Sequence, residues 1–308
     1  MKAIYSKFLT ALLIPVLAAP VVANGQGFTT DPVGAVNIVA PAGTVALSKP
    51  FVEAIEFQSQ ISGNTSDTVT VAGEDLSEYA TGDWYVEFLT GSLEGSIMDV
   101  TAALNDTLTL EGDLTALNGD EVIAVRAHSK LSDIIPAGTL SPFSDSVTLF
   151  DDNGNPLSYL ADGAGGWVDA ITFSPVSEPV VRPANAILVN SNGFSLTLIG
   201  SVKVGPTVIP ITGGAVNIVG SLDPVADLPL EESNVSSVMS PFSDTVSVIN
   251  NDGSASLQSA LYNGAGGFVD ATDFVTPVNP VIPSVGAVIL QPASDQLWEL
   301  PSAYDSVN

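Results

Sequence analysis

The stretch of residues 141–170, SPFSDSVTLFDDNGNPLSYLADGAGGWVDA, decides the fold because it returns at residues 240–271 as SPFSDTVSVINNDGSASLQSALYNGAGGFVDA. Each copy places Asn-Gly or Asp-Gly between strand-like runs, and these dipeptides favour a hairpin turn because their residues tolerate a positive φ. A Gly-Ala-Gly-Gly bend follows, then Trp167 or Phe268. A glycine cluster can also cradle phosphate, but that use needs a following helix, and here a strand is predicted. Each copy therefore predicts a β-hairpin, a tight bend and a buried aromatic side chain.

The repetition extends beyond these two stretches. GAVNIV occurs at residues 34–39 and again at 214–219, and PVVRPANAILV from Pro179 corresponds to PVIPSVGAVIL from Pro280. Internal repetition of this length indicates two structural units of the same kind.

The two copies differ in length between GAVNIV and SPFSD, which start 107 residues apart in the first copy and 26 in the second. The first copy therefore carries an insertion at about residues 55–130. We expect unit one at residues 28–200 and unit two at residues 201–308.

Short runs rich in Val, Ile, Thr and Leu alternate with Gly, Pro, Asn and Asp throughout the chain, which is typical of strands and turns. The fold class predicted is all-β, with two related sandwich-like or barrel-like units and a small inserted β subdomain. Only residues 50–58 and 259–264 resemble short helices or single turns.

The N-terminus has the pattern of a cleaved signal peptide, residues 1–23, with two lysines, a short apolar run broken by prolines and then small residues. A membrane anchor is the alternative, although the run is short for a spanning helix. The chain has no cysteine, which excludes disulfides and thiol chemistry. We expect a secreted or cell-surface protein with no membrane attachment after leader removal.

The chain is strongly acidic. Its formal net charge is −27, and removal of Lys2 and Lys7 with the leader changes this to −29 because all 34 acidic residues remain. Such a surface repels nucleic acid and anionic lipid and attracts cations. We expect neither nucleic acid nor membrane as a partner.

The hairpin turn of the first copy offers a candidate calcium site formed by Asp151, Asp152, Asn153 and Asn155. Oxygen-rich turns in an acidic protein suit Ca²⁺, but the terminal bidentate Glu of a complete calcium loop is missing. The second copy also has asparagines in place of both acids. A plain hairpin turn is the alternative interpretation, and calcium is the only cofactor we consider.

Repeated acids could serve glycoside hydrolysis, which needs two carboxylates about 5–9.5 Å apart. The candidates are Asp145 and Asp169 in the first copy and Asp244 and Asp270 in the second. Each lies beside turn residues, where Asp commonly caps backbone N–H groups, and we favour that role. His128 is the only histidine, and no nucleophile elbow, zinc motif or P-loop is present. We therefore expect no enzymatic activity.

An aromatic strand offers a candidate sugar-binding face. In GDWYVEF, alternation places Trp84 and Phe88 on one side and Tyr85 with Glu87 on the other. We expect the Trp84 side to be core, and Tyr85 and Glu87 to form an exposed face for carbohydrate. A packed strand residue is the alternative role for Tyr85.

Several segments resemble a family of uncharacterised secreted bacterial proteins. They are TTDPVGAVNIVAPAGTVALSKPF after the leader, WYVEFLTGSLEG with the strands that follow it, and the Gly-Gly-Trp-Val-Asp segment. The Asp-Pro-Val-Gly start at residues 31–34 is the most specific part. The resemblance implies export and a β-rich fold, and it implies no catalytic residues.

These observations favour an exported, non-enzymatic structural or interaction protein of the cell surface or extracellular material. Its expected partners are further copies of itself or other surface proteins, and polysaccharide is a further candidate. A carbohydrate-binding module is the alternative function.

Overall fold

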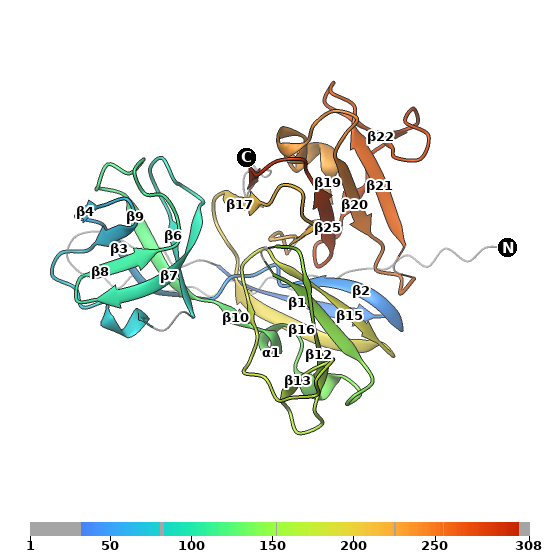
Figure 1. Ribbon diagram of the computed structural model, residues 1–308, viewed down its shortest axis with the longest axis horizontal. Helices are drawn as coiled ribbons and strands as arrows, with labels where there is room; N and C mark the ends of the chain where they lie inside the picture. The colour runs from blue at the N-terminus through green and yellow to red at the C-terminus, as the bar shows by residue number, and fades with distance from the viewer. Residues whose placement is uncertain (1–31, 81–82, 152, 225, 255, 302–308) are drawn as a thin grey trace.

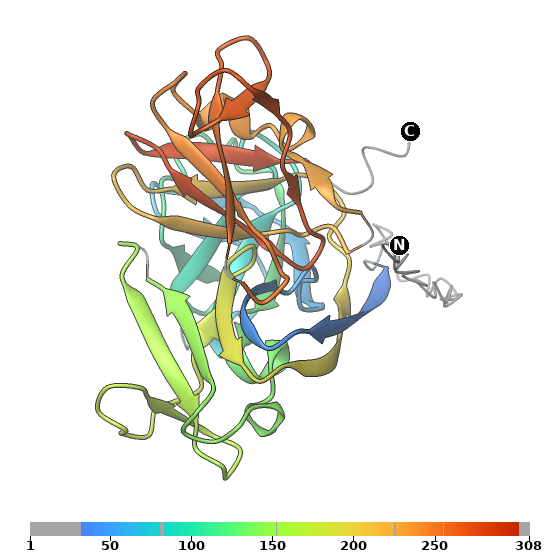
Figure 2. The ribbon, with the colours of Figure 1, turned by 90° about the vertical axis from the view of Figure 1, so that its right-hand side faces the viewer.

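The protein is almost entirely β-structure, which confirms the predicted fold class. The computed structural model describes residues 32–80, 83–151, 153–224, 226–254 and 256–301, so the expected signal peptide lies outside the described residues. Figure 1 shows three bodies, which we call unit one, the inserted module and unit two. Figure 2, turned by 90°, again shows unit two above unit one. No helix of the described residues is long and apolar enough to cross a membrane.

Unit one contains the first copy of the repeated stretch. Its elements are β1 (Val33–Ala40), β2 (Gly43–Ser48), β10 (Ser129–Lys130), α1 (Leu131–Ile134), η2 (Ala137–Thr139), β11 (Ser146–Phe150), β12 (Pro156–Ala161), β13 (Trp167–Asp169), β14 (Val180–Val181), β15 (Ala186–Ser191) and β16 (Phe194–Ser201). A five-stranded antiparallel sheet has the order β13-β12-β11-β15-β2, and β1 pairs with β16 in a separate ribbon.

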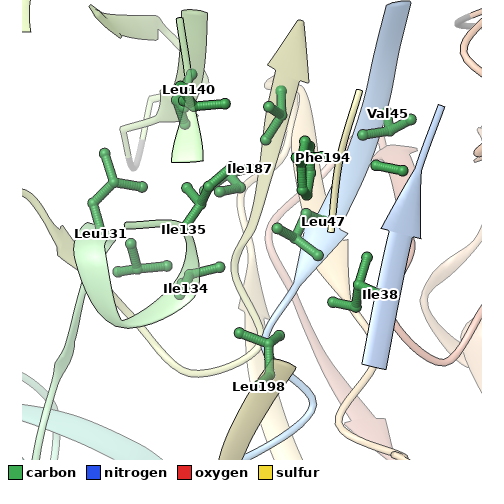
Figure 3. Close-up of a cluster of buried hydrophobic side chains, with 14 of the residues drawn as sticks. Ile38, Val45, Leu47, Leu131, Ile134, Ile135, Leu140, Ile187, Phe194 and Leu198 are labelled. Atoms are coloured by element: carbon green, nitrogen blue, oxygen red, sulfur yellow. The ribbon is translucent and has the colours of Figure 1, made fainter. Parts of the chain in front are cut away.

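The core of unit one lies between the five-stranded sheet and a second layer made of the ribbon and helix α1. Figure 3 shows Leu131, Ile134 and Ile135 of the helical segment facing Leu47, Ile187 and Phe194 of the strands. Trp167 joins this cluster and is 2% exposed, which confirms the predicted packing role of the repeated aromatic position.

Unit two repeats this architecture. Its elements are β17 (Thr207–Ile211), β18 (Asn217–Gly220), β19 (Leu228–Pro229), η3 (Leu230–Glu232), η4 (Val235–Val238), β20 (Thr245–Ile249), β21 (Leu257–Tyr262), β22 (Phe268–Asp270), β23 (Pro277–Val278), β24 (Val281–Ile282), β25 (Ala287–Gln291) and β26 (Gln296–Leu300). Its main sheet has the order β23-β22-β21-β20-β25-β18, and β17 pairs with β26. Phe268, equivalent to Trp167, is 1% exposed in the core.

The repeated hexapeptide GAVNIV does not occupy equivalent strands, so our alignment of the two copies was wrong at this point. Residues 34–39 lie in β1 of the ribbon, whereas 217–219 lie in β18 of the main sheet. Pairing with β15 and β25 shows that β18 corresponds to β2 instead. The same apolar pattern serves either strand: β1 alternates between exposed and buried residues, whereas β18 is buried on both faces, so the long-range partners distinguish them.

The inserted module forms a curled seven-stranded sheet with its own core. Its elements are β3 (Ile55–Gln60), β4 (Gly63–Asn64), β5 (Thr68–Thr70), η1 (Ser77–Tyr79), β6 (Trp84–Phe88), β7 (Ile97–Leu104), β8 (Thr107–Leu110) and β9 (Val122–Ala127). The order is β3-β9-β6-β7-β8-β5-β4, so the two edge strands are also neighbours in the chain. The sheet therefore curls back on itself, as in a partly closed barrel. Residues 50–58 and 259–264, which resemble short helices or single turns, form no helix: β3 includes residues 55–58 and β21 includes residues 259–262.

The main sheets of the two units meet through a fourth apolar cluster. It contains equivalent positions from both units: Ala46 and Ile218, Ala186 and Ala287, Phe150 and Ile249, Leu188 and Ile289. The neighbouring residues on each strand, such as Val45 and Leu47, face the core of their own unit. Strands buried on both faces lose the alternation of a half-exposed strand, which explains the consecutive buried residues of β2.

Backbone hydrogen bonds across this interface are reciprocal. The Ser48 N–H at the end of β2 donates to the Val285 carbonyl at 2.9 Å, and the Gly220 N–H at the end of β18 donates to the Ala184 carbonyl at 2.7 Å. Ser48 and Gly220 are equivalent, as are Val285 and Ala184, so the two units are related by a local approximate two-fold arrangement.

The hairpin turn of each repeated stretch contacts the other unit. Asn251 of the β20–β21 turn accepts from the Ala46 N–H and donates to the Ala46 carbonyl, both at 2.8 Å, and so covers the edge of β2. Gly154 of the β11–β12 turn lies against Val216 at the start of β18, where an added Cβ would be 2.8 Å from the Val216 carbonyl oxygen. Gly154 and its equivalent Gly253 have φ of 77° and 84°, so the Gly of each turn serves both conformation and close approach.

We predict that Asn251→Ala lowers the free energy of unfolding by about 1–3 kcal/mol, because the Ala46 backbone groups lose their partner in a half-buried site. Urea unfolding followed by tryptophan fluorescence measures the change. Asn250→Ala is the matched control, because Asn250 is exposed and its side chain bonds only Ser256 within the turn. Equal effects of the two substitutions would contradict a role for Asn251 in joining the units.

Candidate interaction surfaces

The repeated acids cap loops at equivalent positions. Asp145 accepts a hydrogen bond from the Ser141 N–H at 2.9 Å, and Asp244 accepts one from the Ser240 N–H at 2.8 Å. Both acids are buried, at 5% and 4% exposure. The favoured capping role is therefore confirmed for this pair.

The second pair of repeated acids behaves in the same way. Asp169 accepts from the backbone N–H groups of Ile171 and Thr172, and Asp270 accepts from the Thr272 N–H. Hydrogen bonds from Thr172 and Thr272 hold the pKa of the two acids below its usual value. Acids kept ionised by backbone donors fix turns and are poor proton donors.

At the candidate calcium turn, Asp151 is engaged with its own hairpin. Its carboxylate accepts from the Asn153 and Asn155 N–H groups at 2.9 and 2.8 Å and from the Asn155 amide. Asp152 lies outside the described residues. Across the described ranges, no three His, Cys, Asp or Glu side chains come together as metal ligands. The described atoms here form a capped turn, and calcium binding stays a prediction.

The expected sugar-binding face at Tyr85 and Glu87 is wrong, because both residues are 1% exposed. The face of β6 that carries Tyr85 and Glu87 is covered by Arg126, His128 and Lys203. The Tyr85 ring packs against His128 with centroids 5.0 Å apart. The Trp84 side of the strand belongs to the core of the inserted module as expected, with Val86 and Phe88 fully buried and Trp84 half-buried.

Glu87 is buried because two cations meet it there. Its Oε2 accepts from Arg126 Nε at 2.8 Å, and its Oε1 lies 2.5 Å from Nζ of Lys203, which belongs to the segment between β16 and β17. Arg126 and Lys203 are 1% and 4% exposed. This buried group of charges joins the inserted module to the chain between the two units.

All five Lys and Arg residues of the described ranges lie in ion pairs around the inserted module. Besides Arg126 and Lys203, Lys49 pairs with Glu53, Lys130 with Asp83, and Arg182 with Asp99. Residues 204–308 contain eleven acids and no Lys, Arg or His. The acidic field of unit two is therefore not offset by basic residues of its own sequence.

A cleft of about 740 Å³ lies where the three bodies meet, with Leu157, Val180 and Ile209 among its apolar walls. Its charged end is formed by Asp99, Arg182 and His128. Asp99 Oδ2 lies 2.6 Å from Arg182 Nη2, and Asp99 Oδ1 lies 3.2 Å from His128 Nε2. Burial alone would raise the pKa of Asp99, but His128 and Arg182 outweigh it, so the pKa lies below its usual value. Because Asp99 comes from β7 and Arg182 from unit one, this cluster also holds the inserted module in place.

The most exposed aromatic side chains of the repeated stretches are four phenylalanines, which we call the loop phenylalanines: Phe143, Phe173, Phe242 and Phe274. They form two equivalent pairs, are between 54% and 57% exposed, and have φ between 52° and 63°. The left-handed conformation costs a non-glycine residue about 1–2 kcal/mol. Sequence reasoning missed these positions, although SPFSD is identical in both copies.

The β1–β16 ribbon has an uncharged, partly apolar outer face. Neither strand contains Asp, Glu, Lys, Arg or Pro, and Val33, Val39 and Ile199 are 66%, 79% and 61% exposed. Among the described residues, the ribbon has no third strand, and a bridge to Val52 covers only Ser201 at the end of β16. A long edge of this kind is a template for pairing with another chain.

Other edges are protected. The β17–β26 ribbon contains Pro210 and Glu299 on its exposed face, and Val208 is bridged to Ser96 of the inserted module. Pro175 and Pro277 lie beside β13 and β22. Proline and charged residues are the usual protection against edge-to-edge association. The β1–β16 ribbon lacks both, whereas the equivalent β17–β26 ribbon of unit two has them.

The chain matches no protein-family model, no curated protein and no solved structure.

We predict that Glu87→Ala lowers the free energy of unfolding by about 3–5 kcal/mol, because it leaves Arg126 and Lys203 buried without their shared carboxylate. Glu94→Ala is the control, since Glu94 is an exposed acid of the same module and should change stability by less than about 0.5 kcal/mol. Chemical denaturation measures both. Similar values for the two variants would show that the buried charges do not hold the module in place.

The lowered pKa of Asp99 makes the free energy of unfolding depend on pH. Its lowered pKa stabilises the folded state above the ordinary carboxyl pKa of about 4, and this contribution is lost as the pH falls through the folded-state value. We expect Asp99→Asn to cost about 1 kcal/mol at pH 7 and less at pH 3, since Arg182 is partly exposed and screening limits the ion pair. Urea unfolding of both proteins at the two pH values tests this. An unchanged difference would exclude a contribution from ionised Asp99.

Proposed function

We propose that this chain is an exported, non-enzymatic structural or interaction protein of the cell surface or extracellular material, and that it associates with further copies of itself. The observation that carries the proposal is the open, uncharged β1–β16 ribbon on a strongly acidic protein.

A second copy fits the ribbon for two reasons. An unpaired strand edge binds another strand through main-chain hydrogen bonds, and two identical edges can pair antiparallel about a two-fold axis. A second copy also carries the same net charge of −29 without the leader, so close approach requires a contact face without acids. The ribbon provides such a face.

The hydrogen bonds that the repeated acids accept support the proposal that the protein is not an enzyme. The carboxylates best placed by sequence for hydrolysis each accept backbone hydrogen bonds, in the same way in both units. A role in folding accounts for their repetition. The signal-peptide pattern of residues 1–23 supports export, and the charge supports partners other than nucleic acid and anionic membranes.

Analytical ultracentrifugation tests the proposal. We expect dimers or larger species that become more stable at 0.5 M NaCl, because salt screens repulsion between the copies. Runs with and without calcium separate strand pairing from bridging by cations.

The matched variants are Val39→Glu on the open ribbon and Leu297→Glu on the protected ribbon, at residues that are 79% and 68% exposed. Val39→Glu should raise the dissociation constant at least tenfold, since like charges then face each other, and Leu297→Glu should not. A protein that stays monomeric at every salt and calcium concentration would refute self-association.

A further inference from the structure

The loop phenylalanines combine two unfavourable features at the same position. Each has a bulky side chain at positive φ, where Gly or Asn is the ordinary choice, and each exposes more than half of an apolar ring. Phe143 and Phe242 repeat this in SPFSD, and Phe173 and Phe274 repeat it in the loop after β13 and β22. Backbone strain retained at equivalent places in two diverged units indicates a function other than packing.

Hydrogen bonds fix the backbone of the loops that carry Phe143 and Phe242. The Phe143 N–H donates to the Ala161 carbonyl at 3.0 Å, and the Phe242 N–H donates to the Tyr262 carbonyl at 2.9 Å. The Asp145 and Asp244 caps close the same turn in both units. The bend that follows β12 or β21 is capped by Asp162 in one unit and Asn263 in the other.

The backbone at the second phenylalanine of each unit is held in the same way. The Phe173 N–H donates to the Asp169 carbonyl and the Phe274 N–H to the Asp270 carbonyl, both at 2.9 Å. Asp169 and Asp270 in turn cap the loops that carry these rings. Each unit therefore offers two exposed phenylalanines on loops whose backbone is hydrogen-bonded before any ligand binds, which reduces the entropic cost of ordering the loops on binding.

The surroundings of the rings favour a neutral ligand with many hydroxyl groups. The loops of residues 141–145 and 240–244 contain Ser and Asp beside the ring, and no basic residue. Anionic lipid and nucleic acid are repelled by such a surface. A sugar ring can place its apolar face on the phenyl ring while its hydroxyls bond to the exposed Ser side chains and backbone groups of these loops, since the Asp145 and Asp244 carboxylates beside the rings are buried. The repetition in two units matches a polymer of repeating sugars, because linked sites gain avidity.

We infer that the loop phenylalanines are binding platforms for a neutral polysaccharide, with equivalent rings in the two units. This inference concerns a different surface from the β1–β16 ribbon and does not depend on self-association.

Affinity electrophoresis of the mature full chain in gels containing soluble β-glucan, mannan or xylan tests the inference. We expect at least one of these neutral polysaccharides to retard the protein. Retardation by none of them would overturn the inference. Flotation with phosphatidylcholine vesicles is the second assay, and loop-dependent binding to vesicles in place of polysaccharide would also overturn it.

The decisive variants are Phe143→Gly and Phe242→Gly, alone and together. Each single variant should weaken binding at least tenfold through loss of avidity, and the double variant should weaken it further. Each should also raise the melting temperature by roughly 2 °C or more, because Gly relieves the strain. Leu297→Ala removes an equally exposed apolar side chain outside these loops and should leave binding unchanged.

The combined readout separates binding from folding. Weaker binding with higher stability supports the inference, because a structural role for the rings would lower stability. A drop in melting temperature, unchanged binding in the double variant, or an equal loss in Leu297→Ala would overturn it.

Discussion

The face-to-face packing of the two units depends on how the edges of their main sheets are closed. Strands β2 and β18 are both edge strands, and each ends in a backbone hydrogen bond to the other unit. The Asn251 side chain satisfies Ala46 in the middle of β2, and the Gly154 turn lies on β18. Without these contacts, two open edges would meet water beside an apolar cluster. The repeated stretch therefore forms its own unit and also closes the neighbouring one.

This constraint explains why the repetition persisted in some residues and not in others. The turn glycines, the Asp caps and the buried aromatic position remain because each serves local geometry in both units. The candidate calcium ligands changed, since Asn serves the turn as well as Asp. The basic residues are placed differently: they form ion pairs that hold the inserted module in place, and residues 204–308 contain none.

Local chemistry in the sequence predicted the hairpins, the Gly-rich bends, the buried Trp167 and Phe268 and the all-β class. It failed where a distant segment decides the outcome. Alternation alone placed Tyr85 and Glu87 in solvent, but Lys203 covers this face of β6 from a segment more than a hundred residues away. The shared GAVNIV peptide predicted equivalent strands, but strand pairing, and not the peptide itself, distinguishes β1 from β18. The strained phenylalanines were invisible because propensity favours Gly or Asn at such turns.

The central claim, that the two units close each other's sheet edges, is tested most directly by hydrogen exchange of individual backbone amides in the full chain. The account predicts that the amides of Ala46, Ser48 and Gly220, although on edge strands, exchange as slowly as those of the interior strands β15 and β25 and only on global unfolding. Exchange of these three amides at the fast rate of an open edge, while β15 and β25 remain protected, would contradict it.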